Sequence, residues 1–352
     1  MSVAVKARSG GALKPHPASA ALEELGILDA TEVGLAQVTD LSRAHPVSRV
    51  TLPDGRRWVV KRGHGSGGVD LGVECLIYRM AAWCTPVAEA LPTPIAIDED
   101  RHLLVLEDVG AAQAGSLAQQ VGLPPILYAE VVASSIGTAE LTRLSGLIGA
   151  AMGRLHRATA GFPLPPAPTP VVLAGLGPQS WPLGGAMDDA VTVLREVPTL
   201  VDAAEELAGP VAGCLVNHDL KWDNIVISGP GPAPRPVLLD WEMAGLGDPA
   251  WDLGCLLSEH LVRHPETVEV DQAARALLGA YAAAARVKAG VRSALARRVW
   301  LATALRTAQL ALEVANTPTS ATPQAIERLA DVAGRQLAAT TNLTQEVLRC
   351  LS

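Results

Sequence analysis

Two polar stretches of the chain contain residue types that could do acid–base and metal chemistry. Residues 217–224 have the sequence Asn-His-Asp-Leu-Lys-Trp-Asp-Asn, and Asp240 ends an apolar run. Asp219 could accept the proton of a hydroxyl group, and Lys221 places a cation close by. Asn224 and Asp240 offer the amide and carboxylate oxygens that Mg²⁺ prefers. This combination is what transfer of a phosphoryl group from ATP to a hydroxyl requires.

The chemistry of this transfer suggests a role for each side chain. The γ-phosphoryl group carries spread negative charge, so catalysis is mostly positioning and neutralisation of charge. We predict that Asp219 is the base and that Lys221 steadies the γ-phosphate. Asn224 and Asp240 are predicted to bind the Mg²⁺ that bridges the phosphates. The alternative is that His218 and the aspartates are ordinary polar loop residues, and the full set argues against it.

Short apolar runs around these residues predict strands. Residues 212–216 should lead into the polar loop, 225–227 should leave it, and 237–239 should end at Asp240. The Gly-Pro-Gly-Pro sequence at 229–232 indicates a turn. A hairpin-like unit of this kind would let the loop and Asp240 converge on one ion.

These motifs resemble a known family. The stretch from His218 to Asn224 resembles the catalytic loop of protein kinases. Leu239-Asp-Trp-Glu and Gly247-Asp-Pro-Ala-Trp-Asp-Leu resemble the aminoglycoside phosphotransferase and choline kinase branch of that fold. Protein kinases have Asp-Phe-Gly where this chain has Asp-Trp-Glu, and we find no Ala-Pro-Glu segment. The phosphotransferase branch is therefore the closer match, from about residue 35 to the C-terminus.

The resemblance implies a bilobed, protein-kinase-like α+β fold with ATP and Mg²⁺ as cofactors. A flexible tail is expected over residues 1–18, a small β-rich N-lobe over 19–110, and a larger, mainly helical C-lobe over 111–352. By the same resemblance, Lys61 holds the α- and β-phosphates, and Glu74 in the next helix pairs with Lys61. A solvated glutamate is the alternative for Glu74.

The helix that contains Glu74 should begin at a cap and bury one face. Asp70 is a fair N-cap. Four apolar residues recur at helical spacing and are predicted to face a core. They are Val73, Leu76, Ile77 and Met80.

Three other residues are positional candidates for nucleotide binding. Glu107 and Val109 follow the buried run 103–106 and would form the hinge that offers backbone groups to adenine. Ser42 begins the candidate phosphate-covering loop at 42–46, which has no glycine.

Three polar residues near the motifs have more than one interpretation. Glu242 is a candidate second metal ligand, because the family often has an acid there. By resemblance, the carboxylate of Asp252 bonds the backbone of the catalytic loop, and a helix N-cap is the alternative. His156 lies on an apolar helix, which favours a packed, hydrogen-bonded histidine over a catalyst.

Composition limits the remaining possibilities. A length of 352 residues predicts two domains or one bilobed domain. The net charge of −8 without a basic tract argues against nucleic-acid binding. The five cysteines lack metal-ligand spacing and are expected to be reduced. No signal segment or membrane-spanning stretch is evident, so we expect a cytoplasmic location without membrane association.

Most of the chain after the linker at 110–115 has a helical pattern. Helices are expected at 147–157, at 295–315 and from about 324 to 349, whereas the Pro- and Gly-rich residues 161–185 predict an irregular excursion.

The phosphate acceptor is not fixed by these motifs. Polycationic acceptors require clustered carboxylates, and residues 184–210 supply six acids that could instead be a solvated helix face. The first hypothesis is a small molecule, either an antibiotic or a metabolite. A Ser or Thr hydroxyl of a peptide in a natural-product pathway is the second. The third is a non-catalytic nucleotide-binding scaffold with a protein partner in a biosynthetic complex.

Overall fold

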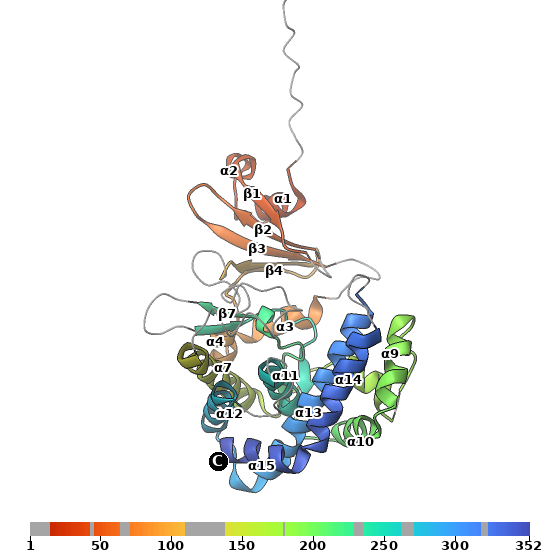
Figure 1. The fold of residues 1–352 in the computed structure, drawn as a ribbon. Helices are drawn as coiled ribbons and strands as arrows, with labels where there is room; N and C mark the ends of the chain where they lie inside the picture. Colours follow the sequence, from red (N-terminus) through yellow and green to blue (C-terminus); the bar gives the residue numbers. More distant parts are fainter. Residues whose placement is uncertain are drawn as a thin grey trace, which may run out of the picture. The chain divides into compact units, whose positions relative to one another are not determined.

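The computed structural model divides the chain into two compact units (Figure 1). One comprises residues 1–71 and 93–108, and the other comprises 72–92 and 109–352. The described residues are 15–42, 46–63, 71–109, 138–178, 180–228, 235–261, 271–317 and 323–352. Asp70, the linker at 110–115 and the turn at 229–232 lie outside them.

The first unit contains a five-stranded antiparallel sheet with the order β1-β2-β3-β5-β4. The strands are β1 Gln37–Asp40, β2 Val47–Thr51, β3 Arg57–Arg62, β4 Pro94–Asp98 and β5 Leu103–Glu107. In β3, Trp58 and Val60 are buried while their neighbours are less so, which is the alternation of a strand with one covered face. β4 was not predicted from the sequence, because Pro94 and the acidic residues that follow the strand obscure its apolar pattern.

Two short helices complete the core of this unit. They are α1 Pro17–Glu24 and α2 Ala30–Leu35. Leu22 and Leu28 from this region join Val50, Val60 and Val105 of the sheet in one buried cluster. Helix α1 begins inside the stretch for which the sequence suggested a flexible tail.

The second unit is mainly helical. Its helices are α3 Gly72–Met80, α4 Thr85–Ala90, α7 Thr138–Thr159, α8 Val171–Leu176, α9 Ala186–Arg195, α10 Pro198–Leu207, α11 Pro249–Leu261, α12 Gln272–Ala285, α13 Ala289–Ala315, α14 Pro323–Ala338 and α15 Thr340–Cys350. Two small sheets pair β6 Cys214–Val216 with β9 Gly245–Gly247, and β7 Ile225–Ser228 with β8 Arg235–Leu238.

Glycines let the helices beneath these sheets approach closely. A Cβ on Gly149 of α7 would lie 2.0 Å from the carbonyl oxygen of Leu277 in α12. A Cβ on Gly254 of α11 would lie 2.6 Å from the Cβ of Ala302 in α13. Helices α7, α11 and α12 contribute the side chains that hold the catalytic loop, so these close contacts bear directly on the site.

Several predicted element details need correction. Leu76 is 39% exposed, so the prediction that it faces a core was wrong, whereas Ile77 and Met80 are buried. The residues that complete the buried face of α3 include Cys75 and Tyr78. The Pro-rich excursion contains helix α8, and the final helix is divided at Ala339.

Candidate active site

The β7–β8 hairpin brings the end of the catalytic loop beside Asp240. Ile225 pairs with Leu238 in antiparallel register. One residue beyond this pair, the Leu239 N–H donates to the carbonyl oxygen of Asn224 over 2.8 Å. Asn224 and Asp240 therefore leave the same end of the hairpin. The sequence predicted this convergence, and the hairpin register explains it.

Asn217 joins the two halves of the site, and the sequence did not single it out. Its side-chain Nδ2 donates to the carbonyl oxygens of Leu239 and Asp240, each over 3.2 Å. Its Oδ1 accepts the N–H of Asp219 over 3.2 Å. The residue is fully buried. One amide group thus fixes the backbone on both sides of the proposed metal position.

The side chains of the catalytic loop converge on Asp219. Lys221 Nζ lies 2.7 Å from Asp219 Oδ2. Asn224 Nδ2 donates to Asp219 Oδ2 over 3.1 Å and to its carbonyl oxygen over 2.9 Å. About a quarter of the Asp219 side chain remains exposed, at 26%. The carboxylate is thus oriented by two donors and remains accessible to an acceptor molecule.

Electrostatics keep Lys221 charged. Burial lowers the pKa of Lys221, but the carboxylates of Asp219 and Glu313 outweigh this effect and leave the pKa above its usual value. The ammonium group is therefore protonated at neutral pH. That state matches the predicted contact with a phosphate.

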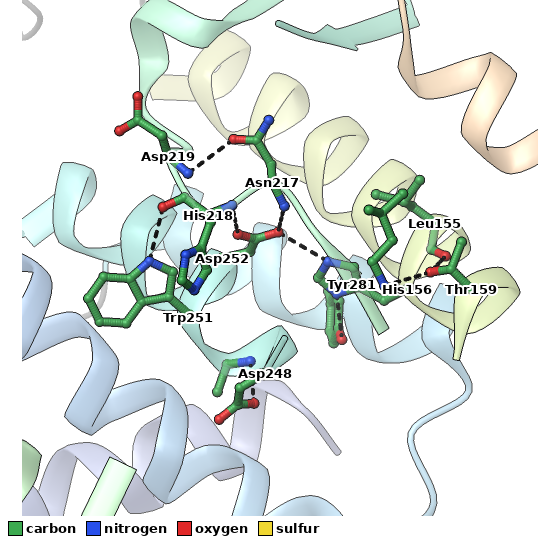
Figure 2. Close-up of polar contacts among 12 residues, drawn as sticks. Leu155, His156, Thr159, Asn217, His218, Asp219, Asp248, Trp251, Asp252 and Tyr281 are labelled. Carbon is green, nitrogen blue, oxygen red and sulfur yellow. Dashed lines mark hydrogen bonds and ion pairs between the residues drawn. The ribbon is translucent and has the colours of Figure 1, made fainter. Parts of the chain in front are cut away.

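Asp252 anchors the backbone of the catalytic loop (Figure 2). Its Oδ2 accepts the N–H of Asn217 and its Oδ1 accepts the N–H of His218, each over 2.9 Å. The neighbouring Trp251 donates its indole N–H to the carbonyl oxygen of His218 over 3.1 Å. Asp252 lies inside α11, which begins at Pro249, so it is not the N-cap of that helix. Of the two interpretations from sequence, the contact with the loop backbone is correct.

Two residues at this point have left-handed backbone conformations. His218 has a φ of 73° and Asp240 a φ of 59°. Such conformations cost a non-glycine residue of order 1–3 kcal/mol and persist when the surroundings hold them. His218 is held through its N–H and its carbonyl oxygen, and Asp240 through its carbonyl oxygen. Burial also lowers the pKa of His218, although nearby aspartates led by Asp252 oppose the shift.

His156 and Tyr281 lie behind Asp252. His156 Nε2 is 3.3 Å from Asp252 Oδ2, and its Nδ1 is 3.2 Å from the Tyr281 hydroxyl. His156 is only 3% exposed. The prediction of a packed, hydrogen-bonded histidine is confirmed, and Tyr281 was missed because nothing along the chain connects α12 to the motifs.

A further group of charged residues lies near Lys221, and the sequence did not indicate it. Arg306 is buried in α13 and forms an ion pair with Glu313, which lies seven residues later in the same helix. Glu259 is half-buried in α11. Burial raises the pKa of Glu259 to about 7; Asp223 and Glu313 raise it as well, and Arg306 opposes them. Residues from α11, α13 and the catalytic loop therefore share one electrostatic environment.

The acidic residues at 184–210 are not part of the charged group around Lys221. Asp188 accepts the backbone N–H groups of Leu183 and Gly184. Glu206 forms an ion pair with Arg297. These two acids have structural roles at a loop and between helices, so the acids around Lys221 are better candidates for acceptor binding.

The predicted nucleotide-binding residues lie mainly in the first unit. Lys61 is half-buried in β3, opposite Val47 and Leu104. The Ser42 hydroxyl accepts the N–H of Val47 over 3.0 Å. Glu107 accepts the N–H of Thr93 through its side chain.

Two other predicted residues belong to the second unit. Glu74 is fully buried in α3, so a solvated glutamate, the alternative considered from sequence, is excluded. Val109 is half-buried. The pairing of Lys61 with Glu74 and the contacts of Ser42, Glu107 and Val109 with nucleotide stay predictions.

The predicted metal ligands offer a suitable donor set. The Nδ2 group of Asn224 donates to Asp219, which leaves the amide oxygen as its donor to a cation. Asp240 offers a carboxylate one residue after Leu239, whose N–H binds the Asn224 carbonyl oxygen, and Glu242 is half-buried two residues later. Oxygen donors of this type suit Mg²⁺, which also takes substrate phosphates and water as ligands. Within the described ranges, no three His, Cys, Asp or Glu side chains form a metal site by themselves.

Comparison with protein families identifies the class. Residues 40–290 match the model of the phosphotransferase enzyme family, also called APH, and the chain belongs to that family. The predicted family and the predicted enzyme class, a phosphotransferase with an alcohol group as acceptor, are confirmed. A comparison with curated proteins finds no significant match.

Solved structures with similar folds support the same fold class. Choline kinase LicA from Streptococcus pneumoniae is 15% identical with a TM-score of 0.53, over 91% of this chain and 98% of that one. Ethanolamine kinase from Plasmodium vivax is 10% identical with a TM-score of 0.51, over 90% and 84%. An amicoumacin kinase in complex with AMP-PNP, Ca²⁺ and Ami is 14% identical with a TM-score of 0.50, over 93% and 95%.

These similarities confirm the predicted bilobed, kinase-like α+β fold. In the part of the chain that the structure describes, every helix is too short or too polar to cross a bilayer.

Proposed function

We propose that the protein transfers the γ-phosphoryl group of ATP to a hydroxyl of a small molecule that also bears an amine. The observation that supports this most directly is the geometry of Asp219. Its carboxylate is accessible and is oriented by Lys221 and Asn224, as a general base for a hydroxyl must be.

In the proposed reaction, Asp219 accepts the proton of the acceptor hydroxyl. The acceptor oxygen forms a bond to the γ-phosphorus, and the bond from phosphorus to the β,γ-bridging oxygen breaks, which leaves ADP. Lys221 leaves Asp219 for the γ-phosphate and neutralises charge as the phosphoryl group moves. Asn224, Asp240 and Glu242 hold Mg²⁺, which neutralises the phosphates when bound.

The nucleotide is assigned to the residues that the family resemblance singles out. Lys61 binds the α- and β-phosphates, and Glu74 orients Lys61. Ser42 binds a phosphate from its turn, and Glu107 and Val109 offer backbone groups to adenine. This assignment rests on the resemblance to the family, together with the position of Lys61 in β3 and the burial of Glu74.

The amine is assigned from the charges around the catalytic loop. Glu259, Glu313 and Asp223 outnumber the two cations among them, Arg306 and Lys221. In the described part of the chain, the Glu259 carboxyl has no hydrogen bond or ion pair. A half-buried carboxyl without a partner gains most from a cationic ligand. Choline kinase and ethanolamine kinase are named for substrates that have a cationic nitrogen and a hydroxyl.

The experiment measures ADP release and phosphate incorporation with MgATP and a set of hydroxyl acceptors. Choline and ethanolamine are compared with 3,3-dimethyl-1-butanol, a neutral isostere of choline, and with a Ser/Thr peptide. Transfer to at least one amine-bearing alcohol, absent in Asp219→Asn, supports the proposal. Transfer to the peptide alone would favour the peptide-kinase alternative. ATP binding without transfer to any alcohol, including a wider library of amino sugars, would favour the scaffold alternative. We also propose a cytoplasmic location, because ATP is available there.

A further inference from the structure

Beneath the catalytic loop, a continuous chain of buried hydrogen bonds begins at two residues that no motif contains. Tyr281 of α12 contacts His156 of α7, and His156 contacts Asp252 of α11 (Figure 2). Asp252 then binds the backbone N–H groups of Asn217 and His218. Three helices that are far apart in sequence therefore meet at one carboxylate.

The hydrogen-bond network continues to both proposed reactive residues, Asp219 and Asp240. Asn217 binds the N–H of Asp219 through its Oδ1 and the carbonyl of Asp240 through its Nδ2. The two site residues with left-handed backbones, His218 and Asp240, are both bound by members of this hydrogen-bond network. Strained backbone of this kind requires surroundings that hold it in place.

The hydrogen-bond roles along the chain follow from the acceptors. Asp252 accepts from two backbone N–H groups, so its buried carboxylate is an acceptor at both oxygens. Nε2 of His156 must therefore be the protonated nitrogen that donates to Asp252. Its Nδ1 lies 3.2 Å from the Tyr281 hydroxyl, so the imidazole ring is held by a polar contact on each side.

We propose that His156 is a positioning residue for phosphoryl transfer, held in place by Tyr281, and that it keeps the catalytic-loop backbone in its strained conformation through Asp252. This inference rests on the proposed function, because it concerns how Asp219 and Asp240 are held for that reaction. His156 does not touch the reacting atoms.

The first test uses hydrogen exchange of the full-length protein, which requires no substrate. Replacing His156 by leucine removes the donor to Asp252, so exchange of the amides at 217–219 should accelerate by about tenfold or more. His156→Gln keeps an N–H donor near the Nε2 position and should restore most of the protection. Tyr281→Phe removes only the hydroxyl and should give a smaller local acceleration.

A matched control separates positioning from general stability. Trp300 of α13 is fully buried and donates its indole N–H to the Gln336 carbonyl, so Trp300→Phe also loses a buried hydrogen bond. Its effect should spread over the helices around α13 and spare the amides at 217–219. The inference would be overturned if exchange at 217–219 did not accelerate in His156→Leu. It would also be overturned if Trp300→Phe, at the same loss of Tm, accelerated exchange at 217–219 as much as His156→Leu does.

The second test uses turnover with whichever acceptor the wild-type protein phosphorylates. His156→Leu should lower kcat by about 10–100-fold, as expected when a support of the reacting groups is lost. The KM for ATP should stay within about threefold, and His156→Gln should recover most of kcat. A kcat within twofold of wild type in His156→Leu would overturn the inference.

Two outcomes need separate treatment. If His156→Leu does not fold, Tyr281→Phe decides, and unchanged exchange at 217–219 in that variant would overturn the inference. A wild-type protein that phosphorylates no alcohol would refute the proposed function, whereas the exchange test would still decide whether His156 holds the loop.

Discussion

Replacement of Glu259 by glutamine should remove the pH dependence of stability that this one group contributes. Burial raises the pKa of Glu259 from 4.5 to about 7. Between these two values the folded protein binds the proton more tightly than the unfolded chain does. Stability therefore falls as the pH rises from about 4.5 to about 7, because folding then buries a charge that water would otherwise solvate.

The magnitude follows from the size of the shift. Each unit of pKa difference corresponds to about 1.4 kcal/mol, so ionised Glu259 lowers the free energy of unfolding by up to about 3 kcal/mol above pH 7. Glutamine resembles the protonated acid and has no such penalty. The variant should be more stable than wild type by up to about 3 kcal/mol at pH 8 and by about 1 kcal/mol or less at pH 5.

The assay is urea unfolding of both proteins at pH 5, 6, 7 and 8, with the difference between them as the measured quantity. Glu140→Gln is a control of opposite sign. Glu140 is exposed and its pKa is lowered, first by its hydrogen bond from Arg143. Its contribution is present above pH 4.5 and is lost as the pH falls, and as a surface pair it should be below about 1 kcal/mol.

The reasoning would be refuted if the difference in free energy of unfolding between Glu259→Gln and wild type stayed constant from pH 5 to pH 8, because the Glu259 carboxyl would then have an ordinary pKa. The amine assignment would also lose its support, since it depends on an unpaired, electrostatically frustrated carboxyl. A cationic acceptor such as choline should, by contrast, bind more tightly as the pH rises through 7.

Three further predictions follow from the site and the packing. Asp219→Asn should lower kcat by about 10²–10⁴-fold, as for loss of a general base, while thermal-shift assays still detect ATP binding; an active variant would contradict the assignment. Asparagine tolerates the left-handed backbone at position 240, so Asp240→Asn mainly removes a charge. The Mg²⁺-dependent part of the ATP-induced rise in Tm should then disappear, as it should when EDTA is added to the wild type. An unchanged rise in Tm would exclude Asp240 as a metal ligand. Gly149→Ala should cost about 2 kcal/mol or more because its Cβ meets the Leu277 carbonyl. Gly146→Ala on the same helix places its Cβ 3.9 Å from the Ala276 carbonyl oxygen, an ordinary contact, and should be neutral or stabilising; equal effects of the two substitutions in urea unfolding would contradict the packing.

The catalytic loop was predictable because its chemistry is local. Asp219, Lys221 and Asn224 lie within one turn-like segment, and the apolar runs on either side predict the strands that present it. The hairpin register then places Asp240 beside Asn224, which the spacing alone had indicated. Family resemblance also led to Asp252, although it left a helix cap as an equal alternative.

Other features were not predictable because their partners are distant along the chain. The face of α3 was misjudged at Leu76 because apolar spacing does not specify which side a neighbouring element covers. β4 was missed for lack of a clear apolar pattern, and the division at Ala339 for lack of a proline or glycine there.

The order of residue types along the chain determined the fold class, the reaction class and the loop that contains the proposed base, because motif spacing and strand periodicity are local properties. Only the tertiary structure decided how that loop is held and what surrounds it. Tyr281 and His156 come from α12 and α7, which glycines allow to pack closely, and Asp252 comes from α11. Glu259, Arg306 and Glu313 acquire their electrostatic character from mutual burial. Neither the contacts between distant helices nor the loss of solvent around a charge can be inferred from neighbouring residues in the sequence.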